Sequence, residues 1–326
     1  MTICKTFRVA FVGLTGVLFL AAAGAALSGS LAACASISDT SPLPNGDASD
    51  LDAGFVPVTD NTSSAPPSTT IDAGPPPPSG RVRLANLLQD TGPVDLCVKA
   101  DSASAPWEGQ RIANPGGLGF GEVSSHVFLP VATSQGQRYQ FRIVPLGGSC
   151  ESEAGALVSI PGGTTTTLRQ GGGLTIAVTG IVGSGDPQTG PKGTVVSDVL
   201  APPAAVAMLR AIHGVSDMTA FDVLINGEMA IQGVKYGSGL GFPYASPNGF
   251  ASLAGGIPEG ATLTLKAGTT ARSFKVPARV RRGVAMTLFA SGRVNGSPQI
   301  AVSLCADRSP PDGETLATCT KLPETE

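Results

Sequence analysis

The chain has 326 residues, a formal net charge of −3 from 21 basic and 24 acidic residues, six cysteines, two histidines and only 5% aromatic residues. Without a basic stripe, and with so few aromatic side chains, the sequence argues against nucleic-acid binding. Two histidines supply little for a metal site, and we expect no cofactor.

The first part of the chain has the order of an export signal. Lys5 and Arg8 precede an almost wholly apolar run, residues 9–27, and small residues follow it. The run is about as long as a membrane span, so a retained transmembrane anchor is one alternative.

A short motif, LAAC at residues 31–34, resembles the lipobox of bacterial lipoproteins. The resemblance implies that the Cys34 thiol receives diacylglycerol, that residues 1–33 are removed, and that the new amino group is acylated. Several acyl chains anchor a protein durably, whereas one chain holds it only marginally. Ala35 follows in place of Asp, which by resemblance to lipoprotein sorting favours the outer membrane. A cleaved or retained signal without lipid is the alternative.

Residues 34–80 form a predicted tether. After Cys34 the segment is rich in Pro, Ser and Thr and contains six Asp and no Lys or Arg. It has too few apolar residues to offset the entropy of ordering. A coil of this length averages about 40 Å end to end and extends to ~150 Å. Without the signal and the tether, the rest is close to neutral, with 19 basic and 18 acidic residues.

The remaining sequence contains an internal repeat, present in two copies. Residues 82–99, VRLANLLQDTGPVDLCVK, align without a gap with residues 209–226, LRAIHGVSDMTAFDVLIN, so Arg83 aligns with Arg210. Three further pairs of segments follow in the same order: 136–143 with 260–267, 174–182 with 286–294, and 194–197 with 300–303.

We therefore predict two homologous domains, residues 81–200 and 206–310, joined by the linker APPAA at 201–205. A tail, residues 311–326, is expected to be tied back by a disulfide. Prolines donate no ladder hydrogen bond, so the linker should not continue a strand. Few contacts are therefore expected to cross it.

Apolar residues in the repeated segments alternate with period two, as Val94, Leu96 and Val98 do, which indicates antiparallel strands. Asn226-Gly227 favours a hairpin because both residues tolerate positive φ. Seven or so short strands per repeat suit an all-β fold of two tandem β-sandwiches. Only two copies exist and the strands are short, which disfavours a barrel or a pair of propeller blades.

The second repeat resembles the bacterial domain of unknown function 4397. Three segments carry the resemblance: RAIHGVSDMTAFDVLING at 210–227, and residues 258–268 and 286–292. The family motif places Arg210 and His213 in a turn, with Asp217 and Asp222 after them. In the first repeat Asn86 replaces the His. The resemblance covers residues 81–310 and implies an immunoglobulin-like or transthyretin-like fold on surface and secreted proteins; the family has no established activity.

Four cysteines remain beside Cys4 and Cys34, and four allow three pairings. Pairing inside each repeat suits export to an oxidising compartment. This predicts two disulfides: Cys97–Cys150 and Cys305–Cys319. A zinc site is the alternative, but no CxxC exists and His is scarce.

Candidate catalytic chemistry centres on His213, which would act as base for Ser216 with Asp217 or Asp222 orienting it. No Gly-x-Ser-x-Gly elbow is present. The first repeat lacks this His yet keeps both Asp, which favours a structural role. In that role His213 hydrogen-bonds backbone in a turn that Asp217 caps, and its loss costs on the order of 1 kcal/mol.

Glycine-rich segments at 117–121 and 237–241 are interpreted as turns, because no helix follows them as a nucleotide fingerprint requires. The sequence thus predicts an envelope lipoprotein anchored to membrane lipid through Cys34. Its role would be structural, adhesive or ligand-binding, with an envelope protein or polysaccharide as partner. An extracytoplasmic hydrolase using His213 and Ser216 is the alternative.

Overall fold

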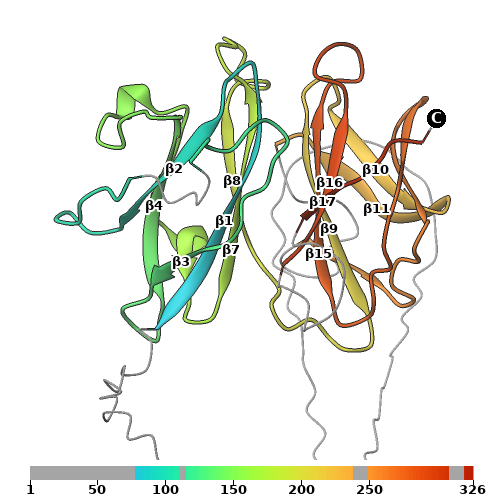
Figure 1. The fold of residues 1–326 in the computed structure, drawn as a ribbon, viewed down its shortest axis with the longest axis horizontal. Coiled ribbons are helices and arrows are strands. Elements are labelled where there is room, and N and C mark those ends of the chain that lie inside the picture. Colours follow the sequence, from blue (N-terminus) through green and yellow to red (C-terminus); the bar gives the residue numbers. More distant parts are fainter. Residues whose placement is uncertain (1–77, 110–114, 238–248, 308–318, 326) are drawn as a thin grey trace, which may run out of the picture. The chain divides into compact units, whose positions relative to one another are not determined.

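The computed structural model describes residues 78–109, 115–237, 249–307 and 319–325. The predicted signal, Cys34, the tether up to residue 77, and Gly239 and Gly241 of the second glycine-rich segment lie outside the described residues. The predicted end of the tether at residue 80 is two residues too late, because Ser79 and Gly80 belong to the first strand. Within them, the regular elements are β-strands and two short 3₁₀ helices, η1 (Glu153–Gly155) and η2 (Thr164–Thr166). The all-β prediction is confirmed (Figure 1).

In the described part of the first repeat there are eight strands: β1 (Ser79–Gln89), β2 (Val94–Ala100), β3 (Val127–Pro130), β4 (Gln137–Pro145), β5 (Val158–Ile160), β6 (Thr167–Leu168), β7 (Gly173–Ile181) and β8 (Lys192–Ser197). One sheet has the order β3-β1-β7-β8. The other has the order β2-β4-β5, and β6 also pairs with β4.

The second repeat, over the residues that the structure describes, has nine strands: β9 (Ala207–Val215), β10 (Ala220–Ile225), β11 (Glu228–Lys235), β12 (Ala251–Leu253), β13 (Thr262–Ala267), β14 (Thr270–Lys275), β15 (Ala285–Gly292), β16 (Ala301–Ala306) and β17 (Cys319–Lys321). Its sheets have the orders β12-β9-β15-β16-β17 and β11-β10-β13-β14.

Each pair of sheets encloses its own apolar core. In the first repeat Leu84 and Ile176 of one sheet face Leu96 and Phe141 of the other in a single buried cluster. In the second repeat an equivalent cluster includes Leu209, Leu288, Val223 and Leu265. Alternation of inward apolar residues on both facing sheets is what defines a β-sandwich.

The expectation of purely antiparallel sheets is wrong. β1 runs parallel to β7, and β9 runs parallel to β15. In each repeat, strands of the opposite sheet lie between the two parallel partners in the sequence. Residue alternation reports burial on one face, not strand direction, so the sequence pattern could not separate the two cases.

Strand register corrects one of the repeat alignments. Thr175 lies opposite Val196 on β8, and its equivalent Thr287 lies opposite Cys305 on β16. Residues 194–197 therefore correspond to 303–306 and not to 300–303.

The predicted hairpin and both predicted disulfides are present. Asn226 and Gly227 have positive φ, 50° and 85°, and join β10 to β11. Cys97 on β2 is bonded to Cys150, and Cys305 on β16 is bonded to Cys319 on β17. The second bond ties the last described segment to the sheet of the second repeat, as predicted for the tail.

Across its described ranges, the chain has no helix long and apolar enough to cross a membrane.

Candidate functional site: the interface between the two repeats

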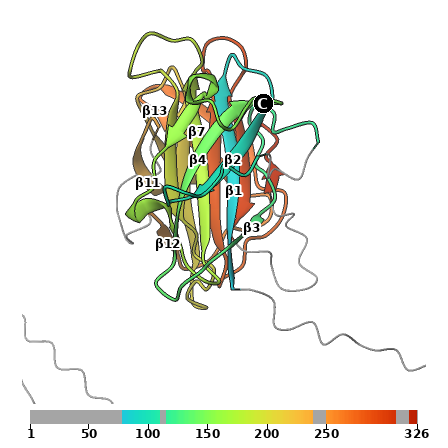
Figure 2. The same cartoon turned by 90° about the vertical axis from the view of Figure 1, so that its left-hand side faces the viewer.

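The β1-containing sheet of the first repeat lies against the β9-containing sheet of the second (Figure 1). In the view of Figure 2 the strands of the two sheets overlap, as stacked sheets do. An apolar cluster between them draws on both repeats: Ala85, Leu87, Ala177, Ile212, Phe289 and Cys305. The expectation that few contacts cross the linker is therefore wrong, because the contacts come from sheet faces and not from the linker.

Arg83 of β1 is fully buried in this interface and bonds to the other repeat. Its Nη2 donates to Asp307 Oδ1 at 2.7 Å, and its Nη1 donates to the Ala306 carbonyl at 2.7 Å. Its Nε donates to Thr175 Oγ1 of its own repeat at 2.8 Å. The guanidinium thus connects one sheet of each repeat.

Arg210 of β9 makes the reciprocal set of contacts. Its Nη2 donates to Asp198 Oδ1 at 2.7 Å, and its Nη1 donates to the Ser197 carbonyl at 2.7 Å. Its Nε donates to Thr287 Oγ1 of its own repeat at 2.8 Å. Each arginine therefore crosses to an aspartate that directly follows a strand of the opposite sheet, β16 for Arg83 and β8 for Arg210.

The two halves are linked by threonine hydroxyls into one network. Thr175 donates to Asp198 at 2.6 Å, and Thr287 donates to Asp307 at 2.7 Å. Both carboxylates are buried with their arginine partners. Two positive and two negative charges cancel, and the arrangement has the reciprocity of an interface between two copies related by a two-fold axis.

Burial by itself would raise the pKa of Asp198, but its surroundings outweigh burial. His126, whose Nε2 lies 3.5 Å from Asp198 Oδ2, and the Arg83 and Arg210 guanidinium groups lower the pKa of Asp198 to about 2. The carboxylate therefore stays charged at neutral pH in a place that excludes water. Such a buried charge is tolerated only while its partners are in position.

Equivalent residues of the two repeats also contact each other across the interface. Ser216 Oγ donates to Oε1 of its counterpart Gln89 at 2.9 Å. Leu87 packs on its counterpart Gly214, where a Cβ would lie 2.8 Å from the Leu87 Cβ. A large residue in one repeat thus meets a small one in the other, and the repeats fit each other better than either would fit its own copy.

The structure places the predicted turn motif differently. Arg210 and His213 lie within strand β9, and both are fully buried. Asp217 follows this strand and accepts the backbone N–H groups of Val294 and Asn295 at 2.8 and 2.9 Å. Asp222 lies in β10 and accepts the Gly233 N–H at 2.7 Å. The Arg-x-x-His pattern is a strand pattern, because positions three apart can both be buried when both faces of a strand are covered.

His213 and Ser216 do not form a base–nucleophile pair. His213 Nδ1 accepts the Val215 N–H at 3.1 Å, while the Ser216 hydroxyl donates to Gln89. Asn86, which replaces the His in the first repeat, accepts the Leu88 N–H at 3.1 Å in the same way. Burial lowers the pKa of His213 to about 3, although Asp217 opposes this shift. A group this weakly basic is poorly suited to general-base catalysis near neutral pH.

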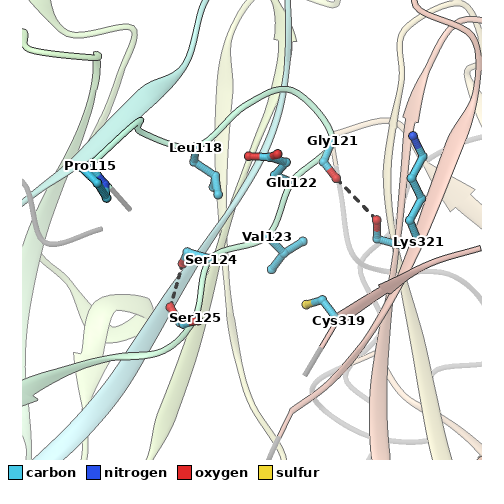
Figure 3. Close-up of a pocket in the computed structure, with 10 residues that line it drawn as sticks. Pro115, Leu118, Gly121, Glu122, Val123, Ser124, Ser125, Cys319 and Lys321 are labelled. Carbon is cyan, nitrogen blue, oxygen red and sulfur yellow. Dashed lines mark hydrogen bonds between the residues drawn. The ribbon is translucent and has the colours of Figure 1, made fainter. Parts of the chain in front are cut away.

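A groove of about 640 Å³ opens at the rim of the interface. Loop residues of the first repeat line one wall, and Ser303, Cys319 and Lys321 of the second repeat line the other (Figure 3). Ser303 Oγ donates to the Gly121 carbonyl at 3.4 Å across it. Glu122 accepts the Gly119 N–H at 2.7 Å and so is tied to its own loop. In the described part of the chain, no group of three or more His, Cys, Asp or Glu side chains could hold a metal ion.

Sequence reasoning paired Arg83 with Arg210 but missed their partners. Asp198 and Asp307 follow the segments whose alignment was three residues out of register. In the correct register, Ser-Asp at 197–198 lies over Ala-Asp at 306–307, and this repeated acid was the available signal.

No family model matches the chain, and no curated protein matches it. Among solved structures, a fimbrial assembly protein from Parabacteroides distasonis is 12% identical, with a TM-score of 0.20 over 71% of this chain and 97% of that one. A candidate cell adhesion protein from Bacteroides fragilis is 11% identical, with a TM-score of 0.17 over 80% and 94%. A candidate cell adhesion protein from Bacteroides eggerthii is 9% identical, with a TM-score of 0.14 over 77% and 96%. TM-scores this low leave the functional conclusions to the chain's own residues.

The buried charge network should show strong energetic coupling. Arg83→Met leaves Asp307 without its main partner and should lower the free energy of unfolding by about 3–5 kcal/mol. Asp307→Asn should cost a similar amount, and the double variant should cost at least about 2 kcal/mol less than the sum. Urea denaturation of the four chains measures this coupling.

The exposed pair Arg272–Glu324, 3.3 Å apart, supplies the matched control. Its cycle, Arg272→Met with Glu324→Gln, should give less than about 1 kcal/mol of coupling because solvent screens it. Equal coupling in the two cycles would show that the interface charges are not buried together.

His213 should make stability depend on pH. The pKa of His213 in the folded chain, about 3, lies below the ordinary 6.5. Between these two pH values the unfolded chain is therefore protonated at His213 and the folded chain is not. The contribution of neutral His213 to the free energy of unfolding is fully present above pH 6.5. It is lost as pH falls toward 3, by about 1.4 kcal/mol per pH unit. His213→Asn keeps an acceptor for the Val215 N–H, as Asn86 does in the first repeat, but cannot titrate.

Between pH 6.5 and 4.5 the wild type should therefore lose about 2–3 kcal/mol more stability than His213→Asn. Chemical denaturation at the two pH values checks this. Identical losses would mean that His213 is accessible to water and titrates normally.

Proposed function

We propose that this protein is a lipid-anchored component of the bacterial envelope. It presents two β-sandwiches, fixed to each other as one head, for a structural, adhesive or ligand-binding role. The observation that carries the proposal is the reciprocal buried pairing of Arg83 with Asp307 and Arg210 with Asp198.

Buried ion pairs specify geometry more than they add stability, because moving either partner leaves a charge unpaired in a dry environment. Two such pairs, crossing in opposite directions, resist both sliding and separation of the sheets. A rigid head suits presentation of loops to a partner, since little entropy is lost when preorganised loops bind.

The same contacts argue against the hydrolase alternative. Ser216 and His213 are both committed to structural hydrogen bonds, and the pKa of His213 is lowered to about 3 by burial. Supporting the envelope location are the export-type N-terminus, the LAAC motif and the acidic tether of the sequence. The resemblance to the domain of unknown function 4397 supports the same location.

Anchoring depends on Cys34. The wild-type chain should fractionate with membranes, require detergent for release, and carry acyl chains on an N-terminal Cys34. Cys34→Ser should block processing or release the chain into the soluble fraction. Cys4→Ser is the matched control and should change nothing, because Cys4 leaves with the signal.

Mass spectrometry of the N-terminal peptide and detergent fractionation of cells measure both properties. An unmodified residue 34, or wild-type protein that is fully soluble without detergent, would contradict anchoring. A pull-down from envelope extracts then separates a binding role, which enriches a partner, from an enzymatic one, which turns a substrate over.

A further inference from the structure

Charge is unevenly distributed over the second repeat. From residue 260 to residue 306 the sequence contains seven basic residues and no acidic residue, although the part of the chain after the tether is nearly neutral as a whole. Five of the seven are exposed, and four of these five fall in one short stretch at the junction of β14 and β15: Lys275, Arg279, Arg281 and Arg282. We refer to residues 276–284 as the arginine loop.

The backbone of the arginine loop is fixed at several points. Val276 and Val280 are buried, and Val280 exchanges two backbone hydrogen bonds with Ile257, at 2.8 and 3.0 Å. The Gly283 N–H donates to the Val206 carbonyl at 2.8 Å. The exposed arginines therefore project from a held backbone, and little backbone entropy is lost when they bind.

Neither Arg279 nor Arg282 has an ion pair or side-chain hydrogen bond within the described ranges. One acid, Glu259, lies in the adjoining turn, where the Gly260 N–H donates to the Val276 carbonyl at 2.8 Å. Glu324 lies beside β14 at Phe274 and pairs with Arg272 at 3.3 Å. Among the described residues here, Lys275, Arg279 and Arg282 outnumber Glu259, so this surface is positive.

The arginine loop lies at the end of the head where the tether joins. Arg83 Nη2 lies 3.4 Å from Thr287 Oγ1 of β15, and Gln89, the last residue of β1, donates from Nε2 to the carbonyl of Gly292, the last residue of β15, at 2.9 Å. β1 and β15 therefore begin at the same end, and the arginine loop leads directly into β15. Figure 1 shows β1 starting at the lower end of the view, where β9 also starts.

We propose that the arginine loop binds the phosphate groups of anionic lipids in the membrane to which the chain is anchored. The inference rests on the proposed function for its membrane, and it adds a contact that orients the head. Guanidinium groups match phosphate geometry and keep their charge at any physiological pH. The end nearest the anchor would then be the end that is attracted to the lipid surface.

The contact is tested with residues 35–326, the processed chain without its acylated cysteine, so that no acyl chain contributes. Binding to vesicles of phosphatidylglycerol and phosphatidylcholine is measured at low salt by co-sedimentation. Each arginine lost should weaken binding about five-fold, equivalent to about 1 kcal/mol. Arg279→Ser with Arg282→Ser should therefore weaken it roughly 25-fold.

The matched control is Lys235→Ser with Lys266→Ser, which removes the same charge. Both lysines are exposed. They pair with the first residues of β10, Lys235 with Ala220 and Lys266 with Asp222. Because β10 begins soon after β9 ends, and β9 starts at the tether end, both lysines lie toward the opposite end of the head. The control should change affinity less than about three-fold, and vesicles of phosphatidylcholine alone should not bind. Circular dichroism of both variants checks that they fold.

Equal losses in the two variants would mean that only net charge matters, and would overturn the proposal. Absence of wild-type binding, or equal binding to neutral vesicles, would overturn it as well. If vesicle binding appears only after the six tether aspartates are replaced by Asn, the arginine loop binds the acidic tether and not lipid, and the proposal is overturned. None of these results depends on lipidation of Cys34, so failure of the anchor and failure of the arginine loop are distinguishable.

Discussion

Two buried charges of each sign, arranged reciprocally across one interface, are the constraint on which the arrangement of the two repeats depends. Arg83 and Arg210 start from equivalent strands and reach aspartates that follow equivalent strands of the opposite sheet, Asp307 after β16 and Asp198 after β8. None of the four can be removed from water alone without a large penalty. The sheets must therefore meet in the one register that pairs both arginines at once.

The remainder of the interface fits this register. Equivalent positions carry different sizes, as Leu87 and Gly214 do, so each repeat complements the other. The side chains that suggest catalysis in the sequence have structural roles in the folded chain. Ser216 bonds to Gln89, and His213 holds the backbone of its own strand. The interface therefore joins the two repeats, and the partner binding proposed above would use the exposed loops and outer faces, among them the arginine loop.

Local sequence patterns predicted what depends on neighbours along the chain. Period-two alternation indicated strands, Asn226-Gly227 indicated a hairpin, and repeat-internal cysteine pairing gave both disulfides. The patterns failed where long-range pairing decides. Alternation could not reveal that β1 runs parallel to β7. The linker prolines indicated a break between repeats, but a break in the chain says nothing about the faces on either side. Arg83 and Arg210 were aligned, yet an arginine in an alternating strand is usually solvent-exposed, and only the aspartates at 198 and 307 reveal why these are buried.

Calorimetry of the processed chain tests most directly whether the two sandwiches form one unit. If the charge network and the packed sheets join them as described, the roughly 240 residues of the head should unfold in a single transition. Its van't Hoff enthalpy should equal the calorimetric enthalpy, on the order of 170 kcal/mol near 60 °C. Two transitions of about half that enthalpy, or a van't Hoff value near half the calorimetric one, would contradict the account, because each repeat would then be folding on its own.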